Sequence, residues 1–134
     1  MLISVVTATL PEVLIVDDDL AGRDALGELL ESRGYSIALA ASGREALDYL
    51  RSASAPKIII LDLMMPMMDG WEFLQHQSRD FALLQIPVIV LTATPPIEPV
   101  RAIAVLQKPI HSDSLFKLLN RYLCPSQLPQ FATK

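Results

Sequence analysis

The chain has 134 residues, of which 51% are hydrophobic, and a formal net charge of −4. This length fits one domain with a sizeable core, and the negative charge disfavours nucleic acid as a direct partner, because phosphate binding needs a basic surface. The apolar residues come in short runs, whereas a membrane span needs about 18 consecutive ones. Cys124 is the single cysteine, which excludes an internal disulfide and makes a cytoplasmic location the simplest expectation.

Three segments are expected along the chain: an N-terminal arm or linker (1–11), a folded domain (12–124) and a short tail (125–134). The apolar stretch Leu2–Val6 has no preceding Lys or Arg, which disfavours a secretory signal. A flexible arm is the preferred interpretation of the first segment. An extra strand, or a hydrophobic arm docked on a neighbour, is the alternative.

Apolar runs alternate with helical patterns throughout the folded domain. Helices are expected from near Leu20 to Arg33, over 42–50, from Asp69 to near Arg79, and from 111 or 112 to 123. This alternation predicts an α/β fold, with helices on both faces of a five-stranded parallel sheet. The apolar runs read as strands cover 13–16, 35–40, 57–62, 86–93 and 102–109.

Helix boundaries carry recognisable signals. Asp19 can cap the first helix, Ser42-Gly43-Arg44-Glu45 is a capping box, and Asp69 stands three residues before Glu72 in the same way. Gly34 follows the first helix as a stop signal. These signals fix where the expected helices begin and end.

Carboxylates follow two of the expected strands. Asp17 and Asp18 come after the first strand without a capping role, and Asp62 ends the third. If these strands are neighbours, three carboxylates converge, and they repel one another unless a proton or cation intervenes. Mg²⁺ suits a site of one or two direct carboxylates completed by water and phosphate oxygens.

Two further strands end in other polar groups, the hydroxyl of Thr92 and the ammonium of Lys108. The carboxyl ends of parallel strands meet at one edge, where open α/β sheets bind ligands. Acids, a hydroxyl and an ammonium together match phosphoryl chemistry, which uses metal ligands, an acceptor carboxylate and groups that hold phosphoryl oxygens.

Four motifs, from about Glu12 to Leu123, resemble the receiver domain of two-component response regulators. The resemblance implies a flavodoxin-like doubly wound sheet of strand order 2-1-3-4-5. It implies a signalling module that promotes its own phosphorylation and is not an enzyme. The motifs are Asp17-Asp18, the 61–70 block around Asp62, Thr92-Ala93 and Lys108-Pro109.

The resemblance assigns the acceptor and the metal ligands. Asp62 would take a phosphoryl group from a phosphohistidine of a histidine kinase or histidine phosphotransfer domain. Asp18, Asp62 and the backbone carbonyl of Met64 would hold Mg²⁺, with Asp17 acting directly or through water. The output partner, the cognate kinase and the oligomeric state stay open, as does whether the chain is a stand-alone protein or one domain of a larger regulator.

The resemblance also assigns the phosphoryl-binding groups. Lys108 would offset charge on the phosphoryl oxygens, and Thr92 with the Ala93 amide would bind them after transfer. Loss of Lys108 or Thr92 is expected mainly to damage the signal, whereas loss of Asp62 should abolish the modification.

The segment between Thr92 and Lys108 departs from the family pattern. The family places a helix there, but residues 94–101 are too few and contain Pro99, which lacks a backbone donor. This helix, the fourth of the family, is therefore expected to be absent or reduced to about one turn. Val105 stands where the family often has an aromatic switch residue, so the output route is expected to differ.

Other functions are weighed against this one. A receiver-like interaction module that signals without phosphorylation is the main alternative. A haloacid-dehalogenase-like phosphatase needs a second Asp where this chain has Met64, and a flavodoxin-like electron carrier would not place Asp17–Asp19 beside a flavin phosphate. Trp71, Phe73 and the methionines after Asp62 are interpreted as packing residues.

Overall fold

The computed structural model describes residues 11–52, 55–65, 69–94, 96 and 98–123. Nearly all of the expected arm (1–10) and all of the expected tail, with Cys124, lie outside the described residues. The elements in chain order are β1 (Val13–Val16), α1 (Leu20–Ser32), β2 (Ile37–Ala40), α2 (Gly43–Ser52), β3 (Ile58–Asp62), α3 (Gly70–Ser78), α4 (Phe81–Leu84), β4 (Val88–Thr92), β5 (Ala104–Gln107) and α5 (Ser112–Tyr122).

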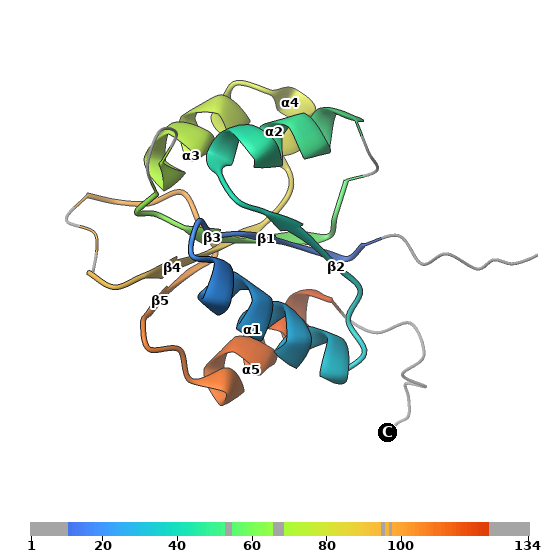
Figure 1. Cartoon of the computed structure of the whole chain (residues 1–134). Coiled ribbons are helices and arrows are strands. Elements are labelled where there is room, and N and C mark those ends of the chain that lie inside the picture. The colour runs from blue at the N-terminus through green and yellow to red at the C-terminus, as the bar shows by residue number, and fades with distance from the viewer. Residues whose placement is uncertain (1–10, 53–54, 66–68, 95, 97, 124–134) are drawn as a thin grey trace, which may run out of the picture.

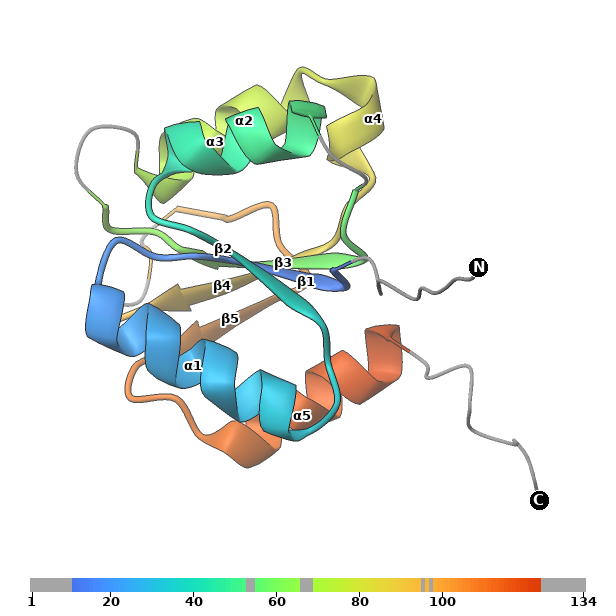
Figure 2. The ribbon, with the colours of Figure 1, turned by 45° about the vertical axis from the view of Figure 1, so that its right-hand side comes forward.

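The five strands form one parallel sheet in the order β2-β1-β3-β4-β5. Helices α2, α3 and α4 cover one face, and α1 and α5 cover the other (Figure 1). The predicted flavodoxin-like α/β fold and its strand order are therefore confirmed. All carboxyl ends of the strands point to the same edge of the sheet, as the turned view in Figure 2 also shows.

Burial explains why the three central strands are almost purely apolar. Strands β1, β3 and β4 are buried along their whole length, whereas the edge strands β2 and β5 are partly exposed. Alternate residues face opposite layers. Val13 and Ile15 pack with α1 and α5, while Leu14 and Val16 pack with α2 and α3.

The helix signals of the sequence operate as predicted. The Asp19 carboxylate accepts a hydrogen bond from the Gly22 amide at 3.2 Å, and the Asp69 carboxylate accepts one from Glu72 at 2.9 Å. The Ser42 hydroxyl accepts from the Glu45 amide at 3.0 Å. Gly34 has a φ of +93°, a conformation that glycine adopts without a steric penalty.

Strands two to five are shorter than predicted, although β3 loses only residue 57 and begins at Ile58. β4 begins at Val88 and not at 86, because Pro87 has no amide to donate to the ladder. β2 begins at Ile37, and β5 covers Ala104–Gln107 only. Between Thr92 and Ala104 the described residues form no helix, in agreement with the expected loss of the family's fourth helix.

The short helix α4 lies between α3 and β4 and was not predicted. Asp80 caps it by accepting from the amides of Ala82 and Leu83, at 3.1 and 3.3 Å. From α3, the buried amide of Gln77 donates to the carbonyls of Leu83 and Ile86, at 2.9 and 3.0 Å. A buried polar side chain thus ties this turn to the helix before it.

Within the part of the chain that the structure describes, no helix has both the length and the apolar character required to cross a membrane.

Replacement of Gln77 by Ala should destabilise the fold by about 1–3 kcal/mol, because the buried Ile86 carbonyl loses its donor. Urea unfolding followed by circular dichroism measures this change. Gln75→Ala on the exposed side of the same helix is the matched control and should change stability little. Equal stability of both variants would contradict this role of Gln77.

Candidate functional site

Three carboxylates meet at the carboxyl edge of the sheet. Val16 pairs with Leu61, so the residues that follow them, Asp17 and Asp62, lie side by side. One oxygen each of Asp17, Asp18 and Asp62 lies within 4.8 Å of the others. Asp17 and Asp62 are both 6% exposed, whereas Asp18 faces solvent. The predicted convergence of the acids is therefore observed in the geometry.

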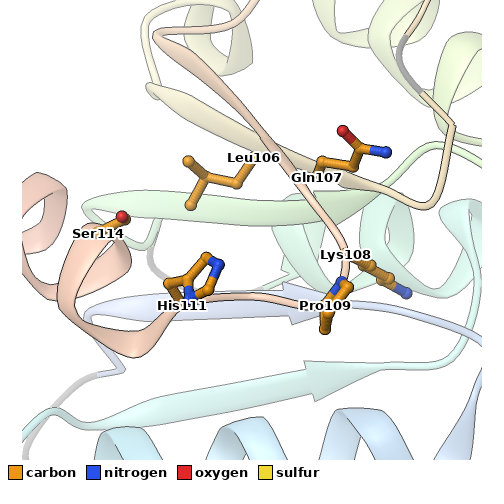
Figure 3. Close-up of a pocket in the computed structure, with 6 residues that line it drawn as sticks. All are labelled: Leu106, Gln107, Lys108, Pro109, His111 and Ser114. Carbon is orange, nitrogen blue, oxygen red and sulfur yellow. The ribbon is translucent and has the colours of Figure 1, made fainter.

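Lys108 brings a positive charge to this cluster. Its Nζ lies 3.3 Å from Oδ2 of Asp17 and 3.6 Å from Oδ2 of Asp62. The backbone amide of Lys108 donates to the Thr92 carbonyl at 2.8 Å, which extends the β4–β5 ladder past its last strand residues. Figure 3 shows the Lys108 side chain turned away from Leu106, His111 and Ser114, although all four residues line the same cavity next to β5.

Burial and the neighbouring charges shift two acid–base groups. Desolvation raises the pKa of Asp62 and the Asp17 charge adds to this, outweighing the Met64 amide and Lys108, which lower it. For Lys108, burial lowers the pKa, but the carboxylates of Asp17 and Asp62 outweigh burial and the pKa is raised. The ammonium is therefore retained, while ionised Asp62 is held at a cost in free energy.

The loop after β1 is fixed by local hydrogen bonds. Oδ1 of Asp17 accepts from the Asp19 amide at 2.9 Å, and the Asp17 carbonyl accepts from Nη1 of Arg23 at 2.9 Å. The sequence interpretation that Asp17 has no local structural role was wrong, because its side chain closes the turn. The Met64 amide donates to Oδ1 of Asp62 at 3.2 Å and orients the third carboxylate in a similar way.

The Thr92 side chain forms its hydrogen bonds with residues other than the three carboxylates. Residues of β3 and β4 alternate between faces, so Asp62 follows Ile58 and Ile60 toward α1 and α5, while Thr92 follows Val90 toward the other layer. The Thr92 hydroxyl donates to the Thr94 carbonyl at 2.7 Å and accepts from the Thr94 amide at 3.3 Å. The structure thus places the hydroxyl at the correct edge but engages it within its own loop.

The residue after Thr92 is linked to the last strand. Nε2 of Gln107 donates to the Ala93 carbonyl at 3.4 Å. Sequence analysis overlooked both Gln107 and Arg23, because a lone Gln or Arg near a strand end carries no distinctive spacing. Arg23 lies six residues after Asp17, and only the helical geometry of α1 brings it back to the loop.

A groove of about 440 Å³ is lined by residues that follow Asp62, by the start of α3 and by the loop after β4. Met64 is 65% exposed at its rim, so the interpretation of all these methionines as packing residues was wrong for Met64. Met65 is buried, as expected, while 67 and 68 lie outside the described residues. The residues that line the groove are Leu63, Met64, Trp71, Thr92, Thr94, Pro96 and Glu98.

Gly70 permits a close backbone approach under the site. A Cβ at this position would lie 2.6 Å from the Leu63 Cα and 2.7 Å from the Asp62 carbonyl oxygen. The Gly70 amide also donates to the Leu63 carbonyl at 2.9 Å. The start of α3 is thus packed against the backbone that carries the Asp62 carboxylate.

The chain matches a known protein family. The model of the response regulator receiver domain matches residues 13–120. Response regulator MprA from Mycolicibacterium vanbaalenii is 46% identical over 84 residues, which are 60% of this chain and 34% of MprA. The chain therefore spans about a third of the length of the curated relatives it matches.

Solved structures of similar fold agree with the family match. The chemotaxis protein CheY4 of Vibrio cholerae superposes with a TM-score of 0.76 at 32% identity, over 85% of this chain and 99% of CheY4. Response regulator TrrA of Thermotoga maritima, solved in complex with Mg²⁺–BeF, gives a TM-score of 0.74 at 27% identity, over 84% of this chain and 99% of TrrA.

Replacement of Asp62 by Asn should stabilise the protein by about 1 kcal/mol at neutral pH without divalent cations, because it removes a buried charge next to Asp17. The pKa of Asp62 is raised in the folded state, so its ionisation lowers the stability of the fold at pH values above that pKa. At pH values below the ordinary aspartate pKa the group is protonated in both states and has no such effect. The gain should therefore shrink as pH falls toward about 4, the ordinary aspartate pKa. Thermal unfolding in EDTA measures it, with exposed Asp48→Asn as control. A destabilised Asp62→Asn variant would contradict this account.

Replacement of Gly70 by Ala should cost about 1–3 kcal/mol, because the new Cβ meets backbone atoms that cannot turn aside. Gly34→Ala is the control: its Cβ meets no atom within 4 Å, and only its positive φ costs about 1 kcal/mol. Only the Gly70 variant should also shift the amide resonances of Leu63 and Met64. Unchanged resonances there would show that the two backbones are not in contact.

Proposed function

The chain belongs to the response regulator receiver domain family, and from this premise we propose that it accepts a phosphoryl group on Asp62 and switches a partner surface. It is thus a signalling module. The observation that carries the proposal is the convergence of Asp17, Asp18, Asp62 and Lys108 at one sheet edge.

The donor set fits a Mg²⁺ ion. Three carboxylates within 4.8 Å supply the oxygen ligands that Mg²⁺ prefers, and like charges this close gain from a cation. We propose that Asp18, Asp62 and the backbone carbonyl of Met64 hold the ion, with Asp17 acting directly or through water. Bound there, Mg²⁺ supplies positive charge next to the phosphoryl oxygens. TrrA, which binds Mg²⁺–BeF, supports this assignment.

The proposed reaction is an in-line displacement at phosphorus, with Asp62 as the nucleophile. A carboxylate oxygen of Asp62 forms a bond to phosphorus while the bond from phosphorus to the donor histidine nitrogen breaks, and that nitrogen keeps the electron pair. The carboxylate is nearly buried, so its desolvation raises its pKa and weakens its ionisation. Lys108, at 3.6 Å, helps to keep the nucleophile charged.

Lys108 has a second proposed role after transfer. Its ammonium bridges Asp17 and Asp62 in the unmodified protein. When Asp62 carries a phosphoryl group, the same ammonium can pair with a phosphoryl oxygen while keeping its contact with Asp17. This pairing would hold the modified state in one geometry.

Thr92 and the Ala93 amide complete the proposed phosphoryl site. The Thr92 hydroxyl is held by the Thr94 carbonyl at 2.7 Å, so binding a phosphoryl oxygen requires this hydrogen bond to break. The loop would then change shape, and Gln107 links that loop to β5. Phosphorylation would act as a local electrostatic event on an element with two arrangements.

The proposed partners follow from the same chemistry. The donor is a phosphohistidine on a histidine kinase or a histidine phosphotransfer domain, and the recipient of the signal is a downstream protein that recognises the altered surface. Because the chain spans about a third of its curated relatives, the effector activity of a whole regulator is not assigned to these residues.

Incubation with acetyl phosphate and Mg²⁺ should add one phosphoryl group, detected by intact mass, because Asp62 is the acceptor. Asp62→Asn is the matched control, since it keeps the size of the side chain and removes the nucleophile. The added mass should also be absent when EDTA replaces Mg²⁺.

Two outcomes would overturn the proposal. An added phosphoryl on the Asp62→Asn protein would place the acceptor elsewhere. An unmodified protein that also binds no Mg²⁺ in calorimetry would favour the alternative, an interaction module that signals without phosphorylation.

A further inference from the structure

The acidic loop after β1 has a second cationic neighbour, Arg23, from the first turns of α1. Its Nη1 donates to the Asp17 backbone carbonyl at 2.9 Å. Its Nε is enclosed and has no hydrogen-bond partner in the structure. The side chain therefore enters the loop from the helix and binds its backbone, and it forms no ion pair with the carboxylates among the contacts described.

This arrangement calls for an explanation. Most buried polar side-chain atoms in native proteins have a hydrogen-bond partner, and each exception needs a specific reason. Asp17 and Asp18 lie next to Asp62, so their mutual repulsion pushes the loop open. Arg23 binds the backbone of this loop, so it can oppose the repulsion while the carboxylate oxygens stay available as ligands.

We propose that Arg23 is a positioning residue for the metal site: by holding the Asp17 carbonyl, it keeps the Asp17 and Asp18 carboxylates in place for a divalent cation. The inference rests on the proposed Mg²⁺ site and adds a residue outside its ligand set. Other bonds support the same loop, since the Asp17 carboxylate caps Asp19 and the Arg23 amide donates to the Asp19 carbonyl at 2.8 Å. This amide hydrogen bond is the first helical bond of α1, so it is the Arg23 side chain that ties the Asp17 backbone to the helix.

If Arg23 acts only through its charge, its removal should change the Mg²⁺ affinity in the opposite direction, so the two roles can be distinguished. A guanidinium close to the acidic cluster repels a divalent cation, so its removal should tighten Mg²⁺ binding if Arg23 acts only through its charge. If Arg23 positions the loop, its removal should weaken binding, because the ligands must be ordered at the expense of binding energy. The direction of the change therefore separates the two roles.

The experiment compares Mg²⁺ affinity of the full chain by isothermal calorimetry. Arg23→Met keeps the apolar stem and removes the donors, and should weaken binding about tenfold. Arg23→Lys keeps a charged donor and should restore most of the affinity. Arg51→Met, in the exposed last turn of α2, makes the same change in net charge away from the loop and should leave the affinity unchanged.

A second readout needs no metal. In EDTA, hydrogen exchange of the Asp19 amide, which donates to the Asp17 carboxylate, should quicken in Arg23→Met, whereas exchange at Met64 should not. This measurement keeps the test decisive if Arg23→Met lowers overall stability, because general destabilisation would quicken both amides.

The outcomes are distinct. Mg²⁺ binding by the unchanged protein, weakened in Arg23→Met and restored in Arg23→Lys, supports the inference. Equal or tighter binding by Arg23→Met, with unchanged exchange at Asp19, overturns it and leaves the proposed function intact. Absence of Mg²⁺ binding by the unchanged protein overturns the proposed metal site and this inference together.

Discussion

The repulsion among three carboxylates at one sheet edge is the constraint on which the site depends. Asp17 and Asp62 are brought together by the register of β1 and β3, which is fixed by apolar residues that pack on both faces. Hydrophobic burial is strong enough to hold charges where their own interaction would separate them. Lys108 offsets part of this repulsion, while burial is the main cause that raises the pKa of Asp62. A cation bound at this edge of the sheet would reduce the repulsion among the three carboxylates.

Much of the fold and part of the site could be predicted from sequence. The buried strands β1, β3 and β4 are continuous apolar runs, and the caps Asp19 and Asp69 have fixed spacings to the amides they bind. These signals lie within short stretches of the chain, so they can be recognised without knowing which elements pack together in the fold. The strand order came from a resemblance, because periodicity does not distinguish one neighbour from another. Once the order is known, the meeting of Asp17 with Asp62 follows.

The remaining features depend on contacts that no local pattern encodes. The short helix α4 is supported by Gln77, a buried amide on the preceding helix that binds the Leu83 and Ile86 carbonyls. Arg23 returns to the loop after β1 only through the geometry of α1. Met64 is apolar yet exposed, although its neighbours Leu63 and Met65 are both buried. In each case the environment of the side chain depends on the three-dimensional arrangement and cannot be deduced from the residue type.

Under the proposed function, the connection from β4 to β5 would carry a change at Asp62 to the surface. The described residues between these strands form no helix, and Val105, 42% exposed, occupies the position where a rotating aromatic ring would be expected. A signal cannot pass through ring rotation there, because valine has no ring to move. Other contacts are present in this region, among them the hydrogen bonds of Thr92 with Thr94 and of Gln107 with Ala93. Both lie in the loop that borders the groove lined by residues that follow Asp62, so a rearrangement of Thr92 would reshape that groove directly. The output of this chain is therefore best sought at the groove and at the exposed edge of β5.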